Sequence, residues 1–83
     1  MAKTYNIDIV KRAYPDDTKI ANGDTVVWTN KMSMDHTVTA DNGEFDSGAF
    51  GEDATFSQTF NTAGSFPYHC EIHASMKGKV TVT

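Results

Sequence analysis

Three residue types that bind metal ions follow one another near the C-terminus: Cys70, His73 and Met76. Their spacing, Cys-x2-His-x2-Met, allows one loop to wrap a thiolate, an imidazole and a thioether around a single ion. Soft sulfur donors select Cu(I) and zinc, and imidazole suits Cu(II). Two imidazoles with one thiolate and a long axial Met describe a redox-active copper centre. The loop therefore predicts a copper site that needs a second histidine from elsewhere in the chain.

His36 is the candidate for the second histidine. The chain has three histidines, and His69 directly precedes Cys70. Successive side chains of a strand point to opposite faces, so His69 is expected to lie on the solvent side, away from the thiol. The predicted metal ligands are therefore His36, Cys70, His73 and Met76.

Zinc binding and nucleophilic catalysis are the rival interpretations of Cys70. Structural zinc sites usually combine four side chains that include two or more thiolates, and this chain has one cysteine. Nucleophilic thiols usually lie at a helix N-terminus or another electropositive place, and no helix of useful length is predicted here. Each candidate ligand also has an ordinary structural role when taken alone, so their combination and spacing carry the copper prediction.

Short alternating runs of β-branched and aromatic residues dominate the chain and predict strands. Turn-forming residues separate these runs, as in Tyr14-Pro15-Asp16-Asp17 and Asp41-Asn42-Gly43. We expect strands near residues 3–10, 18–21, 24–30, 36–40, 55–60, 65–70 and 77–83. Their lengths and spacing predict an all-β sandwich of seven to eight strands without a substantial helix. We expect a single domain over residues 1–83.

The strand before the cysteine indicates how such a sandwich would position the site. Phe66, Tyr68 and Cys70 alternate with Pro67 and His69, so the thiol follows a row of inward-facing aromatic side chains. The site would then cap one end of the core. A chain this short buries only a little over about 60% of its unfolded surface, so a bound metal would also stabilise the fold.

Charge and hydropathy argue against several partners. A net charge of −4 without a basic stripe argues against nucleic acid. No apolar run approaches the roughly 20 residues that cross a bilayer, and residues 1–5 lack the apolar core of a signal peptide. A single cysteine leaves the redox compartment open. Residues 41–53, here called the acidic segment, carry five carboxylates and no Lys or Arg, which suits either a solvated loop or a docking surface for a basic partner.

Two stretches carry a resemblance to a known family. Residues 23–30, Gly-Asp-Thr-Val-Val-Trp-Thr-Asn, lead toward His36, and residues 63–70, Ala-Gly-Ser-Phe-Pro-Tyr-His-Cys, lead into the predicted ligand loop. Both stretches resemble the cupredoxins, the type 1 blue copper proteins, with the short ligand loop of the amicyanins and a further likeness to the plastocyanins. The resemblance implies a Greek-key β-sandwich that holds one copper ion at one end.

The same resemblance implies a small monomeric carrier that cycles between Cu(I) and Cu(II) and passes one electron through the exposed edge of His73. Its partners would be transient redox proteins, and the periplasmic or extracellular side would be its location. Two alternatives stay open. One is a copper redox protein whose accessible site reacts with a small molecule such as a nitrogen oxide. The other is a copper carrier or buffer that uses Met32 and Met34.

Some positions depart from the family pattern. Residues 72–75 lack the prolines and the bulky aromatic residue that stiffen and fill the amicyanin loop. Asp35 replaces a proline, and Thr37 replaces an asparagine that usually ties the two ligand segments together. We therefore expect a looser lid, and we hypothesise that the copper or the edge of His73 is more accessible to water or a small molecule than in a typical electron carrier.

Overall fold

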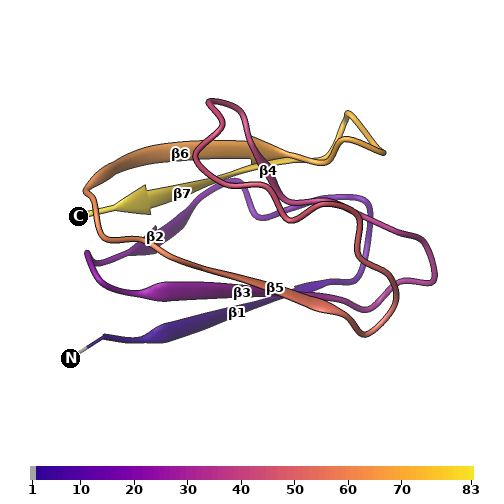
Figure 1. The fold of residues 1–83 in the computed structure, drawn as a ribbon, viewed down its shortest axis with the longest axis horizontal. Helices are drawn as coiled ribbons and strands as arrows, with labels where there is room; N and C mark the ends of the chain where they lie inside the picture. The colour runs from indigo at the N-terminus through magenta and orange to yellow at the C-terminus, as the bar shows by residue number, and fades with distance from the viewer. Residues whose placement is uncertain (1) are drawn as a thin grey trace.

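The computed structural model describes residues 2–83, whose strands form two facing sheets (Figure 1). One sheet has the order β1-β3-β5, with strands Thr4–Ile9, Thr25–Asn30 and Thr55–Thr59. The other has the order β2-β7-β6-β4, with strands Thr18–Ile20, Lys77–Val82, Gly64–His69 and Thr39–Ala40. The prediction of an all-β sandwich of seven to eight strands is confirmed. Residues 2–83 contain no helix, and so none that could cross a membrane.

The largest difference from the predicted strands is at residues 36–40. Only Thr39 and Ala40 pair with β6, whereas His36 forms an isolated antiparallel bridge with Phe50. The His36 N–H donates to the Phe50 carbonyl at 3.2 Å, and the Phe50 N–H donates back at 3.0 Å. His36 pairs with the loop that contains Phe50 and not with a strand of either sheet. His36 is therefore fixed by a loop contact rather than by a strand.

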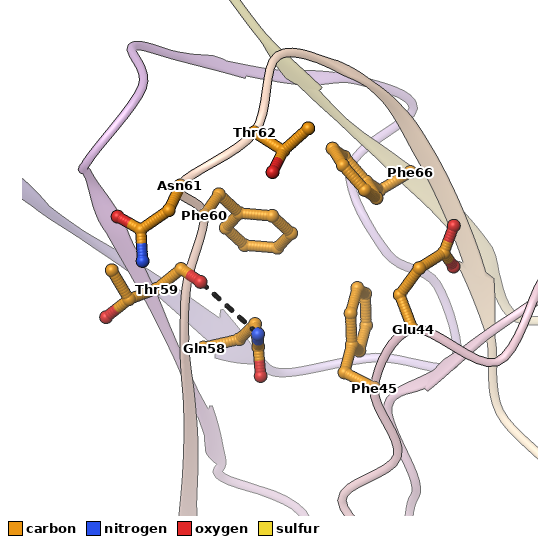
Figure 2. A pocket seen from close by; sticks show the side chains of 8 residues that line it. All are labelled: Glu44, Phe45, Gln58, Thr59, Phe60, Asn61, Thr62 and Phe66. Atoms are coloured by element: carbon orange, nitrogen blue, oxygen red, sulfur yellow. Dashed lines mark hydrogen bonds between the residues drawn. The ribbon is translucent and has the colours of Figure 1, made fainter.

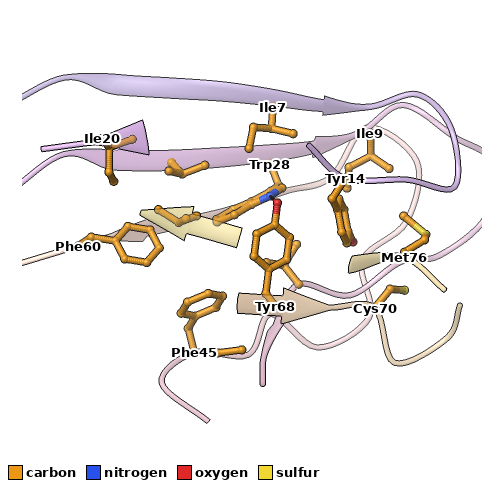
Figure 3. Close-up of a cluster of buried hydrophobic side chains, with 14 of the residues drawn as sticks. Ile7, Ile9, Tyr14, Ile20, Trp28, Phe45, Phe60, Tyr68, Cys70 and Met76 are labelled. Carbon is orange, nitrogen blue, oxygen red and sulfur yellow. Dashed lines mark hydrogen bonds between the residues drawn. The ribbon is translucent and has the colours of Figure 1, made fainter. Parts of the chain in front are cut away.

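Alternating side chains from both sheets build the core. Trp28 of β3 and Tyr68 of β6 are fully buried, and the Trp28 Nε1–H donates to the Tyr68 hydroxyl at 3.2 Å (Figure 3). Their rings lie edge to face with centroids 5.3 Å apart, an arrangement that aromatic pairs favour. Opposite Tyr68, a Cβ on Gly78 would lie 2.7 Å from the phenol. Glycine is therefore needed for the ring to cross β7.

A hollow of about 240 Å³ lies beside the connection from β5 to β6 (Figure 2). The rings of Phe45, Phe60 and Phe66 form its apolar wall, and Glu44 and Gln58 are among its polar lining. No histidine or cysteine lines this hollow. Figure 3 places Cys70 and Met76 at one end of the core cluster, away from Phe60, so these two predicted ligands lie at a different end of the sandwich.

Candidate metal centre

The loop from β6 to β7, residues 70–76, is closed by two backbone hydrogen bonds. The Cys70 N–H donates to the Met76 carbonyl at 3.0 Å, and the Met76 N–H donates to the His73 carbonyl at 2.9 Å. Strand β6 ends at His69, and alternation turns the next side chain inward, so Cys70 is fully buried as predicted. Met76, directly before β7, is fully buried as well. The short loop therefore brings both sulfur side chains to the same end of the core.

Cys70, His36 and His73 meet at this end of the core. Their candidate ligand atoms all lie within 4.8 Å of one another. Cys70 Sγ is 4.0 Å from His36 Nδ1, and the two imidazole centroids are 5.1 Å apart. A thiolate and two imidazoles in one cluster are donors that suit copper. His36 belongs to a separate segment 34 residues from Cys70, so the cluster exists only in the packed sandwich.

Two ring nitrogens of this cluster, His36 Nε2 and His73 Nδ1, are buried and have no hydrogen-bond partner among the described residues. Leaving a buried polar atom unpaired costs about 1–3 kcal/mol, and a metal bound at His73 Nδ1 would offset this cost. At His36 the nitrogen that lies 4.0 Å from Cys70 Sγ is the other one, Nδ1. Burial, the neighbouring His73 imidazole and the Arg12 guanidinium lower the pKa of His36. A neutral imidazole keeps its lone pair available near neutral pH. The residues present therefore fit a copper ion.

Asn30 is a positioning residue that the sequence reasoning missed. Its fully buried side-chain amide donates to the carbonyls of Met34 at 2.7 Å and Phe50 at 3.0 Å and accepts the Met32 N–H at 2.9 Å. These bonds shape the turn after β3 and hold Phe50, the backbone partner of His36. The signal was a polar residue on the inward face of β3, where the alternation calls for an apolar one.

Tyr14, which the sequence placed only in a turn, is a second residue that was missed. Its side chain is buried, and its hydroxyl donates to the Thr37 carbonyl at 2.6 Å. The centroid of its ring lies 5.0 Å from the centroid of the Tyr68 ring. Burial and the adjacent Cys70 raise the pKa of Tyr14 well above its ordinary value, so the phenol keeps its proton and remains a donor.

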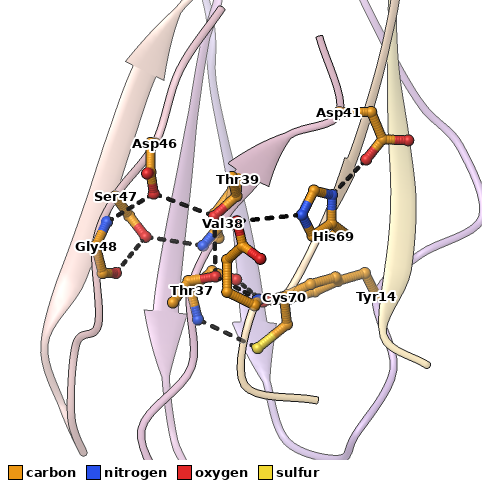
Figure 4. A network of polar contacts seen from close by, with 11 residues as sticks. Tyr14, Thr37, Val38, Thr39, Asp41, Asp46, Ser47, Gly48, His69 and Cys70 are labelled. Carbon is orange, nitrogen blue, oxygen red and sulfur yellow. Dashed lines mark hydrogen bonds and ion pairs between the residues drawn. The ribbon is translucent and has the colours of Figure 1, made fainter. Parts of the chain in front are cut away.

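Thr37 ties the two ligand segments together. The Glu71 N–H donates to Thr37 Oγ1 at 2.8 Å, and the Thr37 N–H donates to Cys70 Sγ at 3.3 Å (Figure 4). Where the family pattern has asparagine, the threonine hydroxyl therefore reaches the backbone of the ligand loop and supplies a tie between the two segments. A backbone N–H on the thiolate also withdraws electron density from it, and contacts of this kind tune a bound metal.

His69 lies outside the cluster, as predicted. Its Nδ1–H donates to Asp41 Oδ1 (Figure 4). Glu71 Oε1 is 3.6 Å from Nε2. The hydrogen bond to Asp41 raises the pKa of His69. Its side chain is 27% exposed, so the imidazole is a partly solvated partner of two carboxylates rather than a metal ligand.

Met32 and Met34, which the copper-carrier alternative would use, have different surroundings. Met32 packs against the core, whereas Met34 Sδ accepts a contact from the Arg12 guanidinium at 3.6 Å. The positive charge of this exposed guanidinium disfavours a cation at the thioether while the contact is made. Packing against the core therefore accounts for Met32, and the contact with Arg12 accounts for Met34.

Comparison with known proteins agrees with this geometry. The profile for copper binding proteins of the plastocyanin/azurin family matches residues 12–83. The chain belongs to this family. Amicyanin from Paracoccus denitrificans is 37% identical over 87 aligned positions, which cover 92% of this chain and 63% of that protein. Plastocyanin from Scenedesmus fuscus is 36% identical over 81 positions, which cover 82% of this chain and 83% of that protein.

Solved structures show the same fold. An oxidised amicyanin variant superposes with a TM-score of 0.88 at 33% identity, covering 95% of this chain and 81% of that chain. A second amicyanin variant, in the Cu(I) form, superposes with a TM-score of 0.86. The cupredoxin sandwich implied by the resemblance is thereby confirmed. The chain spans less than two thirds of the length of the Paracoccus denitrificans amicyanin.

Proposed function

We propose that this chain is a mononuclear type 1 copper protein and a one-electron carrier, with copper held by His36, Cys70, His73 and Met76. The observation that carries the proposal is the cluster of one thiolate and two imidazoles within 4.8 Å at the end of a cupredoxin sandwich. Copper bound there supplies one-electron chemistry by alternating between Cu(I) and Cu(II). A single folded domain would provide all four ligands.

The surrounding residues would keep these ligands nearly fixed while the charge changes. Cys70 accepts the Thr37 N–H, and its own N–H is bound to Met76. His36 is held through both backbone bonds to Phe50. Ligands that are held by packing and hydrogen bonds move little between two oxidation states. Such rigidity supports fast outer-sphere electron transfer.

The route for the electron would be the edge of His73. Among the proposed ligands, His36, Cys70 and Met76 are fully buried, whereas His73 is partly exposed. Ile72 beside it is 49% exposed and gives the surface an apolar contact point. Transient redox encounters usually bury less than about 1,200 Å², so a small patch of this kind is sufficient for docking.

The partners would be redox proteins, and we propose that their docking surfaces are basic. Support comes from the acidic segment. Within it, the Asp41 carboxylate accepts a hydrogen bond from His69, the residue directly before Cys70. Opposite charges speed diffusional encounter and lose this effect as salt rises. We further propose a monomer that works on the periplasmic or extracellular side, as the likeness to amicyanin suggests. Electron-transfer rates that are insensitive to salt would contradict the basic partner.

The decisive experiment is to titrate the apoprotein with Cu(II) and to record visible absorption and EPR spectra. We expect one copper per chain and an intense thiolate-to-copper band that bleaches on one-electron reduction and returns on oxidation. Cys70→Ser should abolish the band, and Ser75→Ala, in the same loop, should leave it intact. A band that survives Cys70→Ser would overturn the ligand assignment.

Small-molecule chemistry at copper is the competing function, and burial of the ligands argues against it. Neither His36 nor Cys70 exposes surface, and Thr37 holds the loop that the sequence led us to expect loose. Stopped-flow mixing of the reduced protein with nitrite separates the two functions. A carrier is oxidised at most stoichiometrically, whereas repeated turnover with excess reductant would establish the enzyme.

A further inference from the structure

A line of hydroxyl groups joins the ligand loop to the acidic segment. The Glu71 N–H donates to Thr37 Oγ1 at 2.8 Å. Thr37 Oγ1 lies 3.0 Å from Thr39 Oγ1, and Thr39 Oγ1 donates to Asp46 Oδ1 at 3.1 Å (Figure 4). Both threonines are buried, whereas Asp46 is exposed. The line therefore runs from the peptide that follows Cys70 to a carboxylate on the surface.

The direction of each hydrogen bond in this line is fixed by proton count. An ionised carboxylate only accepts, so the single proton of the Thr39 hydroxyl points to Asp46. Thr39 has no second hydroxyl proton, so Thr37 must donate to Thr39. The Thr37 oxygen then accepts from Glu71. All three bonds point toward Asp46, and hydrogen bonds aligned in one direction polarise one another.

Asp46 itself is held in place. The Gly48 N–H donates to the same Oδ1 at 3.0 Å, and Asp46 forms an isolated bridge with Thr39. The Ser47 N–H donates to the Val38 carbonyl at 3.0 Å, and Ser47 Oγ accepts the Val38 N–H at 2.8 Å. The carboxylate is therefore oriented by its backbone rather than free to rotate in solvent.

We propose that Asp46, through the hydroxyls of Thr39 and Thr37, is a positioning residue that sets the electrostatic environment of the Cys70 thiolate. The proposal rests on the electron-carrier function proposed above. Negative charge polarised toward the peptide after Cys70 favours the more positive Cu(II) state. A basic partner docked on Asp46 would weaken this polarisation, and its arrival at the acidic segment would be felt at the copper.

Two simpler effects must be separated from this coupling. A carboxylate near the site acts through solvent whether or not the hydroxyls are present, and it is screened by salt. Loss of a threonine hydroxyl also loosens the loop without any electrical effect. A double-mutant cycle separates the coupling, because a through-solvent charge adds to the loss of Thr37 whereas a charge that acts through Thr37 does not.

The experiment is a redox titration of the copper-loaded protein, without a partner, in four single variants and one double variant. Asp46→Asn removes the charge, and Glu44→Gln is the matched control, an exposed carboxylate of the same segment outside the line. Thr37→Val removes the hydroxyl at similar volume, and Thr37→Ser restores it. The double variant combines Asp46→Asn with Thr37→Val.

We expect Asp46→Asn to raise the reduction potential, with a change of about threefold in the Cu(I):Cu(II) ratio at a fixed poise, within the range for residues of one hydrogen-bond network. Glu44→Gln should change the ratio less. In the Thr37→Val background, Asp46→Asn should change the Cu(I):Cu(II) ratio no more than Glu44→Gln changes it in the wild type. Equal shifts from the two charge changes, or the same Asp46 shift with and without the Thr37 hydroxyl, would overturn the proposal.

A copper-free measurement keeps this proposal separate from the proposed function. In the apoprotein, the amide proton of Glu71 reports its hydrogen bond to Thr37 by NMR. Asp46→Asn should move this resonance, Glu44→Gln and Thr37→Ser should leave it nearly unchanged, and Thr37→Val should shift it most. If Asp46→Asn leaves this resonance unchanged, the proposed coupling through the hydroxyls is overturned, even where the copper-loaded protein shows the blue absorption band. If the resonance responds but no blue copper band forms, the proposed function alone fails.

Discussion

The two ends of the sandwich treat buried polar atoms differently. At the end where β3 begins, the buried carboxylate of Asp24 accepts the N–H groups of Lys3 at 2.8 Å and Ala21 at 2.9 Å. At the end where β3 leads toward the ligands, the described residues offer no hydrogen-bond partner to His36 Nε2 or His73 Nδ1. At the first end the buried carboxylate is paired within the chain, and at the second end two buried imidazole nitrogens are left unpaired beside the thiol of Cys70.

This contrast separates what the fold requires from what the site requires. A satisfied buried network rigidifies a structure, whereas an unpaired buried polar atom costs free energy and needs another explanation. Local rules are broken most often at functional sites. The end marked by Asp24 therefore serves the fold, and the end marked by His36 and His73 serves the site. Each of the following variants tests whether the two ends separate in this way.

The largest effect is expected at Trp28, which belongs to the core shared by both ends. Trp28→Ala should lower the free energy of unfolding by about 3–5 kcal/mol, because it leaves a cavity and removes the hydrogen bond to Tyr68. Urea denaturation of the apoprotein measures this change. Val10→Ala, at a side chain that is 65% exposed, is the control and should change stability by less than about 0.5 kcal/mol. A small loss at Trp28 would mean that the two ends do not share one core.

Copper should stabilise the folded state through the ligand end. At a free concentration of 100 to 1,000 times its dissociation constant, binding stabilises the folded state by about 3–4 kcal/mol. His73→Ala should remove most of this gain, since it deletes a proposed ligand, whereas Asp24→Asn should leave the gain unchanged. Thermal denaturation with and without copper gives both values. An equal gain in the His73 variant would place the metal elsewhere.

Asn30 offers the next largest effect, since it supports the ligand end through hydrogen bonds rather than through metal binding. Asn30→Ala leaves the Met34 carbonyl and the Met32 N–H without their side-chain partner. The Phe50 carbonyl loses one donor and keeps the His36 N–H as the other. We expect a loss of about 2–3 kcal/mol of stability. The variant should also broaden the copper EPR signal because His36 loses its support. Asn61→Ala, at an exposed turn, is the control. An unchanged copper signal would limit Asn30 to a role in stability.

The smallest effect is expected for Asp24, and it depends on pH. The N–H groups of Lys3 and Ala21 lower the pKa of Asp24 from its ordinary 3.8. A carboxylate with a lowered pKa stabilises the folded state above the ordinary value, and this contribution is lost as pH falls through the lowered pKa. The stability difference between the wild type and Asp24→Asn should therefore be constant near neutral pH and shrink below about pH 3.8. Asp16→Asn, at an exposed turn, is the comparison, and an equal pH dependence in both variants would contradict this role.

The strands were the part of the fold that local pattern predicted well. The alternation of Phe66, Tyr68 and Cys70 follows from the geometry of a single strand. Tyr68 and Cys70 are fully buried as this predicts, whereas Phe66 is half-buried against the edge of the core. Residues 36–40 were predicted less well. Only Thr39 and Ala40 join the sheet, because His36 pairs with Phe50 on another loop. A contact between two loops produces no periodic pattern of apolar residues in the sequence of either loop.

The supporting residues of the site were harder to predict than the donors. Asn30 and Tyr14 act through hydrogen bonds to distant backbone groups, and their own sequence neighbourhoods indicated only a strand end and a turn. Thr37 was misjudged for the same reason. Its departure from the family pattern suggested a lost tie, whereas its hydroxyl accepts the Glu71 N–H in the folded chain. Whether such a group finds a partner depends on how two remote segments approach each other.

The sequence by itself determined which donors the chain can offer a metal, because the Cys70, His73 and Met76 side chains lie on one short loop whose spacing is local. It also determined the inward row that ends at Cys70, because strand alternation is local. Only the tertiary structure decided that His36 approaches Cys70 across 34 residues and that threonine hydroxyls join the loop to Asp46. Those contacts form when the sheets pack, and packing depends on the whole chain at once.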